Sequence, residues 1–114
     1  MAAVPNVQVP PRDLSRSLEE VLGPKLVAVI AGVSSTEIVH AWSRGEREPQ
    51  PEIVERLRNT AEVANTLLAV ESPQTVQSWF MGTNSALDGH APALMLASDP
   101  AMVLLAARSF AAHG

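Results

Sequence analysis

The 114-residue sequence contains no cysteine and no tyrosine, and it has only two tryptophans and two phenylalanines. The absence of cysteine excludes disulfide bonds and thiolate metal sites, and it is compatible with a reducing cytoplasm. The longest apolar run, over residues 26–33, is far shorter than the roughly 20 residues that span a bilayer. Because the proline-containing N-terminus also lacks the basic start of a signal peptide, we expect a cytoplasmic protein with no membrane partner.

Positive charge is also scarce, with eight lysines and arginines against twelve acidic residues and a net charge of −4. Proteins that bind DNA without sequence preference normally carry a basic face. Residues 24–48 have as many basic as acidic side chains, whereas residues 71–114 have one arginine against three carboxylates. Because phosphate neutralisation supplies much of the affinity for DNA, we expect a monomer to bind DNA weakly. DNA binding would then need a homodimer or a basic partner.

Apolar residues recur at helical spacing and predict an all-α fold. Leu14, Leu18 and Leu22 lie four residues apart and predict a first helix, with Asp13 as its N-cap. A long helix with one apolar face is predicted over residues 51–70. No alternating strand pattern occurs in the sequence.

Prolines and glycines predict where the helices begin and end. Proline is favoured at the first helical position, and further helices are predicted to begin at Pro24, Pro51, Pro73, Pro92 and Pro100. Asp99 precedes the last of these and is the expected cap of the final helix. Because no strands flank Asp88 and Gly89, this pair is interpreted as a turn between helices rather than as a hairpin.

Residues 24–43 have the pattern of two short helices joined by a tight turn. Ala28 is small where the helices would cross, and Gly32 lies where the turn needs a positive φ. Ser34 and Glu37 have the spacing of a capping box at the start of the second helix. The buried side of that helix is predicted to consist of Val33, Ile38 and Ala41. This is the arrangement of a DNA-reading helix-turn-helix, and the alternative is an ordinary helical hairpin in a small bundle.

The helix-turn-helix interpretation selects a set of DNA-binding residues. They are Ser34, Ser35, Thr36, His40, Arg44 and Arg47, with Val39 and Ser43 on or beside the same outward face. Short hydroxyls and an imidazole can contact base edges and phosphates, and the two arginines are predicted to be phosphate clamps. The side chains that specify guanine or adenine most strongly are absent from this helix, which predicts modest base specificity. Trp42 could stack on the DNA backbone, but burial in the core is the favoured interpretation.

Catalytic and metal-binding patterns are not found. His40, His90 and His113 are too widely separated for a recognisable metal site. Ser85 and Asp88 near His90 have suitable chemistry but no triad spacing, and no nucleophile elbow or phosphate loop occurs. We therefore expect no enzymatic activity, no cofactor and no bound metal.

The second informative segment extends from residue 79 to residue 96. Trp79 and Phe80 supply a large buried area, Leu87 is expected to anchor the loop in the core, and the segment after Pro92 is expected to pack back through Leu94 and Leu96. These features by themselves predict a helical cap on the long helix.

The same segment resembles a known family. The pattern Trp-x4-Asn-x2-Leu-x-Gly-x2-Pro, from Trp79 to Pro92, resembles the toxin-binding domain of Xre/MbcA/ParS-like antitoxins. The earlier Gly-Val-Ser…Ala-Trp-x-Arg-Gly-x-Arg-x-Pro-x-Pro block resembles the Xre-type DNA-binding half of those proteins. The resemblance covers about residues 14–114. Ala91 departs from the family, which often has threonine there, and the usual acidic residue after Pro92 is missing.

The resemblance implies a function and a division of the chain. Such antitoxins neutralise a RES-domain toxin, an NAD-consuming enzyme, by direct binding, and they repress their own operon by binding operator DNA. The resemblance implies a helix-turn-helix domain over residues 13–70 and a toxin-binding domain over 71–114, and the prolines before them predict a flexible arm over residues 1–12. The residues expected to bind the toxin are Trp79, Asn84, Leu87, Arg108, Phe110 and His113. For Phe110, core packing is an equally good interpretation.

Two other functions fit the sequence. A stand-alone helix-turn-helix repressor would have no toxin partner, and a pure interaction module would have lost DNA binding. A homodimer is expected for the antitoxin and for the stand-alone repressor, because both bind DNA. One short recognition helix reads too few base pairs, and two half-sites about 34 Å apart are the common solution.

Overall fold

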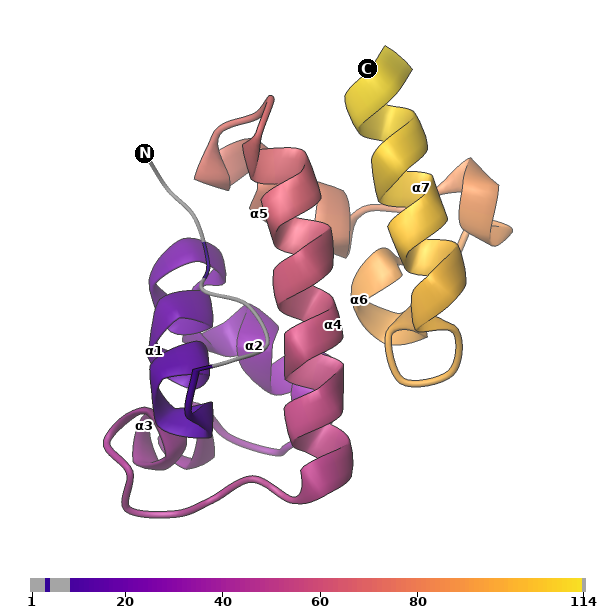
Figure 1. The fold of residues 1–114 in the computed structure, drawn as a ribbon. Helices are drawn as coiled ribbons and strands as arrows, with labels where there is room; N and C mark the ends of the chain where they lie inside the picture. Colours follow the sequence, from indigo (N-terminus) through magenta and orange to yellow (C-terminus); the bar gives the residue numbers. More distant parts are fainter. Residues whose placement is uncertain (1–3, 5–8, 114) are drawn as a thin grey trace.

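The computed structural model of the chain describes residue 4 and residues 9–113. Within these residues the protein is entirely helical and contains no strand, which confirms the all-α prediction (Figure 1). The elements, in chain order, are α1 (Pro11–Leu22), α2 (Pro24–Ala31), α3 (Thr36–Ser43), α4 (Pro51–Leu68), α5 (Pro73–Met81), the 3-10 helix η1 (Ser85–Leu87), α6 (Pro92–Met95) and α7 (Pro100–His113).

The five predicted proline starts are confirmed, because α2, α4, α5, α6 and α7 each begin at the expected proline. Proline is suited to this position since its φ is preset and its missing N–H has no partner inside the helix. The same preference for proline explains why the predicted N-cap of the first helix is wrong. Helix α1 begins at Pro11, after Pro10, and Asp13 lies in its first turn. The predicted cap of α7 is confirmed, since Asp99 Oδ1 accepts a hydrogen bond of 3.3 Å from the Met102 N–H.

The predicted flexible arm over residues 1–12 lies largely outside the described residues. Where it is described, it is attached to the helices. Val4 is buried, and the side-chain amide of Asn65 in α4 exchanges two hydrogen bonds of 2.7 Å with its backbone N–H and carbonyl. Pro11 and Arg12 already belong to α1.

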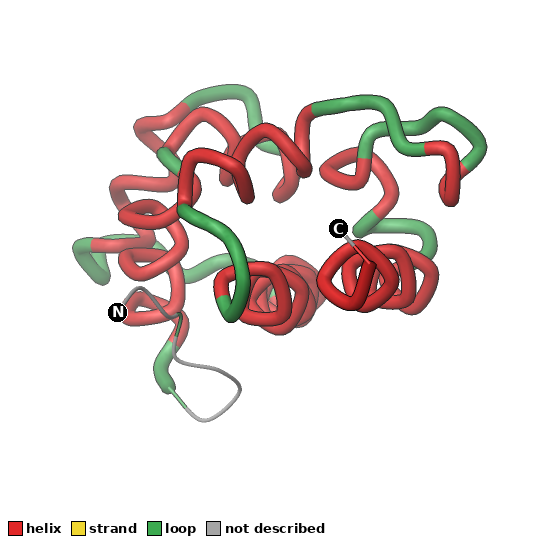
Figure 2. The backbone as a smooth tube through the Cα atoms, turned by 90° about the horizontal axis from the view of Figure 1, so that it is seen from above, coloured by secondary structure: helices red, strands yellow, loops and turns green. Residues whose placement is uncertain are grey.

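Helix α4 runs through the middle of the molecule, with α1 on one side and α7 on the other (Figure 1). Seen from above, α7 and α4 lie side by side with nearly parallel axes (Figure 2). The core is one continuous cluster that includes the predicted stripe of Leu14, Leu18 and Leu22 as well as Val103 and Ala107 of α7. The proposed domain boundary at residue 70 therefore does not interrupt the core, and the division remains a prediction.

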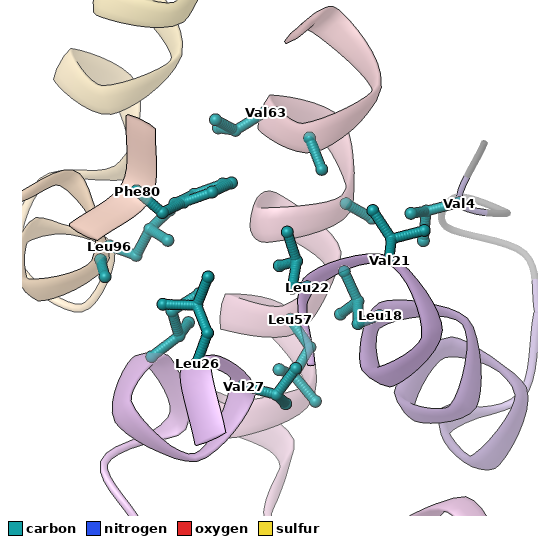
Figure 3. Packing of buried hydrophobic residues seen from close by; sticks show 14 of the residues in the cluster. Val4, Leu18, Val21, Leu22, Leu26, Val27, Leu57, Val63, Phe80 and Leu96 are labelled. Carbon is teal, nitrogen blue, oxygen red and sulfur yellow. The ribbon is translucent and has the colours of Figure 1, made fainter. Parts of the chain in front are cut away.

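The aromatic side chain of Phe80 joins the two parts of the core. It is fully buried, and it points from α5 towards α4, close to Leu96 (Figure 3). The prediction that Leu94 packs back as Leu96 does is wrong, because Leu94 is 67% exposed while Leu96 is buried. Leu96 follows directly after α6, which ends at Met95. Residues two positions apart in helical backbone point to nearly opposite sides, so only one of the two leucines faces the core. The turn at Asp88 and Gly89 is confirmed, with both residues at positive φ.

The end of α4 differs slightly from its prediction. The helix stops at Leu68, two residues early, and Val70 is exposed. Among the described residues, no single helix combines the length and apolar character of a membrane span, and α2 and α3 meet that test only as a pair bent by 99°.

Candidate nucleic-acid interface and partner surface

The turn between α2 and α3 has the geometry that the sequence predicted. The two helices are inclined at 99° and are separated by residues 32–35. Gly32 has φ of 75°, its N–H donates to the Val29 carbonyl (3.2 Å), and the next N–H, of Val33, donates to the Ala28 carbonyl (3.0 Å). This is a Schellman motif, which needs a left-handed residue after the helix. The angle and the turn length fall within the range of helix-turn-helix motifs.

Arg56 of α4 fixes the C-terminal end of α2. Its Nη1 donates to the carbonyls of Ile30 and Ala31 at 3.1 and 3.0 Å. The last carbonyls of a helix have no partner inside the helix, and a cation also interacts favourably with the negative end of the helix dipole. Arg56 therefore holds α2 against α4 at the point where the turn begins.

The predicted capping box at the start of α3 is wrong. The helix begins at Thr36, and its N-cap is Ser35, whose side chain makes no capping hydrogen bond. Ser35 is extended, with φ of −150°, so the helix starts one residue later than predicted. Glu37 then occupies the second helical position and not the third, which removes the geometry of the box.

Helix α3 is attached to α1 by a group of polar contacts centred on Glu19. One carboxylate oxygen lies 2.6 Å from Nδ1 of His40, and the other accepts a hydrogen bond of 2.6 Å from the hydroxyl of Ser43. Arg16 of α1 adds a hydrogen bond of 3.0 Å to the Ser43 carbonyl. Two side chains predicted on or beside the outward face, Val39 and Ser43, are in fact buried. Because α3 packs against both α1 and α2, less of its surface is free than the pattern suggested.

The predicted DNA-binding residues lie before, within and after α3. Ser34 and Ser35 are exposed before the helix, Thr36 and His40 are partly exposed, and Arg44 and Arg47 are exposed after it. Ile38 is partly buried, Ala41 is buried, and the core interpretation of Trp42 is confirmed because this side chain is 3% exposed.

The two arginines differ in their surroundings. Arg44 donates to both carboxylate oxygens of Glu46 at 3.0 and 3.1 Å. This hydrogen-bonded contact lowers the pKa of the Glu46 carboxyl and raises that of Arg44, so the pair is charged at neutral pH. Arg47 makes no ion pair with the residues that the structure describes. It lines a hollow of about 220 Å³ together with Arg12 of α1, so α1 adds a cation to the corner that the sequence assigned to Arg44 and Arg47 alone.

The residues predicted to bind a toxin have mostly structural environments. Trp79 packs edge-on against Phe80 at 5.3 Å between ring centroids, and it lies 6.5 Å from Phe110. Phe110 is partly buried against the core, as in the core-packing interpretation. Asn84 caps η1 through a hydrogen bond of 2.9 Å to the N–H of Ala86.

The other three predicted toxin-binding residues divide in the same way. Leu87 is buried in the core. Arg108 and His113 are exposed on α7, and Arg108 lies 4.0 Å from the carboxylate of Glu62 in α4. Of the six predicted residues, only Arg108 and His113 are exposed, whereas Trp79, Asn84 and Phe110 are partly exposed.

A different set of side chains forms the apolar surface. Val29, Met81 and Leu94 are each at least half exposed and line one hollow of about 220 Å³ between α2, α5 and α6. Met102 and Leu105 are exposed three residues apart on α7. The exposure of Met102 and Leu105 could have been predicted, because large apolar residues occur on several faces of the last helix. The grouping of Val29, Met81 and Leu94 could not, because these residues come from segments far apart in the chain.

The described histidines do not form a metal-binding cluster with acidic side chains. In the part of the chain that the structure describes, no group of three or more histidine and acidic side chains could hold a metal ion.

Comparisons with models of protein families, with curated proteins and with solved structures found no match for this chain.

Proposed function

We propose that this protein is an antitoxin of a type II toxin–antitoxin system. Its helix-turn-helix binds operator DNA upstream of its own gene and represses the operon. Its C-terminal helices bind and silence a RES-domain, NAD-consuming toxin. The mechanism is stoichiometric binding, without chemistry by this chain.

The observation that supports the DNA-binding half most directly is the geometry of α2 and α3. Their inclination of 99° and the turn over residues 32–35 place a short, separately fixed helix at the surface. In helix-turn-helix proteins the second helix lies in the major groove and its N-terminal residues contact base edges. Ser34, Ser35 and Thr36 occupy that end of α3 and are accessible.

Arg47 and Arg12 are the cations best placed to contact phosphates, since Arg44 is paired with Glu46. A mobility-shift titration on the DNA upstream of the gene, repeated across salt concentrations, tests this arrangement. Arg47→Ala is expected to weaken binding to all sequences and to reduce the salt slope by about one. Arg108→Ala is the matched control, because it removes the same charge from α7. Equal effects of the two substitutions would contradict the docking.

A homodimer fits the operator-binding role, because α3 has only eight residues. Two copies bound to half-sites about 34 Å apart would double the number of bases read. Sedimentation of the protein with its upstream DNA measures the stoichiometry, and we expect two chains per operator. One chain per operator at saturation would contradict the dimer.

The exposed apolar side chains support the partner-binding half. Large apolar residues grouped on a surface are typical of protein–protein contact sites. We expect co-expression with the product of the adjacent gene to restore growth and to give a complex that copurifies. The double substitution Met81→Ser and Leu94→Ser should weaken that complex, and Glu71→Ser, on a partly exposed position outside the hollow, is the control.

We also propose that the C-terminal tail, residues 108–114, inserts into the toxin and blocks its active site, a role called the plug below. Deletion of these residues tests this proposal. The deletion also removes Phe110, which contacts Trp79, so thermal unfolding of the truncated chain must be measured beside growth. Full neutralisation by a folded truncated chain would eliminate the plug. Loss of neutralisation with an unchanged melting temperature would support it.

A pure interaction module remains the alternative that a specific observation favours. The Arg44–Glu46 pair removes one of the few cations beside α3, and Glu37 on α3 is exposed. Such a protein would bind the adjacent gene product and would leave its upstream DNA unshifted at all salt concentrations.

A further inference from the structure

Among the residues that the structure describes, Glu19 is the one acidic side chain that contacts the candidate recognition helix through both of its carboxylate oxygens. The two contacts, to His40 Nδ1 and to Ser43 Oγ, are each 2.6 Å long. The Glu19 side chain is only 17% exposed, and that of His40 is 33% exposed. The carboxylate is thus largely shielded from water by the helix that it holds.

The contacts define the hydrogen positions on the imidazole. An ionised carboxylate only accepts hydrogen bonds, so Nδ1 of His40 must carry a proton, and this N–H donates a hydrogen bond to Glu19. The hydroxyl of Ser43 donates to the second oxygen. In the neutral ring, Nε2 is then the unprotonated nitrogen, and it can only accept.

We propose that Glu19 is a positioning residue for DNA reading. It holds His40 in the Nδ1–H form, so that Nε2 is presented as an acceptor to an exocyclic amino group of adenine or cytosine in the major groove. This inference depends on the proposed operator binding. It gives the candidate recognition helix a base-reading atom that the amino-acid type alone does not supply, since free histidine can carry its proton on either nitrogen.

Among the described charged residues around His40, Glu19 is the one that contacts the imidazole. Arg16, Glu20 and Arg44 line the same hollow as His40, but none of them has a hydrogen bond to the imidazole among the described residues. Ser43 is buried, and its carbonyl is held by Arg16. The helix end is therefore fixed independently of His40, and substitution of Glu19 by glutamine should preserve the fold.

The first test is a nitrogen-15 NMR spectrum of the free protein at a pH at which the imidazole is neutral. We expect Nδ1 of His40 to be the protonated nitrogen in the wild type and in Glu20→Gln. In Glu19→Gln the amide can accept from Nδ1 or donate to it, so a mixture of tautomers is expected. A wild-type His40 protonated on Nε2 would overturn the inference, whatever the DNA result.

The second test measures binding to the upstream DNA and to a random duplex of equal length. Glu20→Gln is the matched control, because it removes the same charge from the same helix. Relative to this control, Glu19→Gln should lower affinity for the upstream DNA roughly tenfold, as expected for a weakened hydrogen-bond arrangement, and leave binding to the random duplex unchanged. Equal affinities of the two variants for the upstream DNA would overturn the inference.

A double-substitution cycle separates positioning from general support of the fold. If Glu19 acts through His40, Glu19→Gln should have no further effect on the upstream DNA when His40 is already alanine. An additional loss of the same size would show that Glu19 acts by another route and would overturn the inference. Failure of the wild-type protein to shift its upstream DNA would instead reject operator binding itself, and the NMR result would still report on Glu19 and His40.

Discussion

Helices α3 and α7 both bury apolar side chains against the rest of the protein, but they differ in their polar contacts. Helix α3 buries Val39 and Trp42 and is also held by side-chain hydrogen bonds with α1, and the preceding helix is held by Arg56 of α4. Helix α7 is held by buried apolar side chains such as Val103 and Ala107, and its described ion pair to α4 is 4.0 Å long.

The difference is informative because hydrogen bonds fix direction as well as contact. A helix that must present particular donors and acceptors benefits from directional partners, whereas apolar burial is non-directional. In this protein the directional contacts surround the candidate DNA-reading helix. The exposed large apolar side chains lie mainly on α5, α6 and α7, where a protein partner is proposed to bind.

Among single substitutions, Phe80→Ala is expected to destabilise the protein most. Phe80 is the largest of the fully buried side chains, and it joins α5 to the shared core. Truncation should lower the free energy of unfolding by about 3–5 kcal/mol, from lost burial and the cavity that remains. Thermal or urea unfolding measures the change. The control is Met81→Ala, at a side chain that is 61% exposed, where the change should be within about 0.5 kcal/mol.

A smaller effect is expected for Arg56→Ala. This substitution leaves the Ile30 and Ala31 carbonyls without their side-chain partner, and a loss of about 1–3 kcal/mol in unfolding free energy is expected. Urea unfolding provides the measurement, and Glu55→Ala, an exposed neighbour on α4, is the control. A loss no greater than that of the control would mean that polar contacts do not hold the turn between α2 and α3.

Removal of the α7 cap should cost less. Asp99 Oδ1 accepts from the Met102 N–H at 3.3 Å, and loss of such a cap typically costs about 1 kcal/mol. Asp99→Ala should therefore destabilise the protein less than Phe80→Ala, because apolar burial and not capping attaches α7. Ser98→Ala is the matched control in the same melting experiment. A loss as large as that of Phe80→Ala would contradict the attachment of α7 by apolar burial.

The smallest effect is expected for Arg44→Ala, because exposed ion pairs contribute little to stability. The lowered pKa of Glu46 determines the sign of its pH dependence. The stabilisation from the pair is present above the pKa that Glu46 has in the unfolded chain, and it is lost as the pH falls through the lowered pKa of the folded state. Melting temperatures across an acid series should show a small loss in the wild type that Arg44→Ala lacks. Identical pH profiles would contradict this assignment.

Local sequence signals predicted most of the helices. Pro24, Pro51, Pro73, Pro92 and Pro100 begin helices as predicted, since proline restricts φ and lacks an N–H whatever the surroundings. Gly32 has the predicted positive φ for an equally local reason. The predicted helix start was three residues late at Asp13 and one residue early at Ser34.

The candidate site was predicted less completely. The accessible ends of α3 agree with the prediction, but Val39 and Ser43 are buried because α1 covers a face that the pattern left open. Glu19, Arg16 and Arg56 were not predicted to support α3 and its turn. Each meets its partner across more than 20 residues of chain, so no pattern within one helix contains the signal.

The helical fold, the positions where most helices begin and the glycine turn between α2 and α3 could be predicted from the amino-acid sequence, because they depend on backbone preferences of a few neighbouring residues. The contacts between charged groups and the exposure of apolar side chains became known only from the folded chain, as Glu19 with His40 and Leu94 beside Met81 illustrate. The physical reason is that such contacts depend on the angles at which helices pack, and these angles follow from the fit of the whole core and not from any single segment.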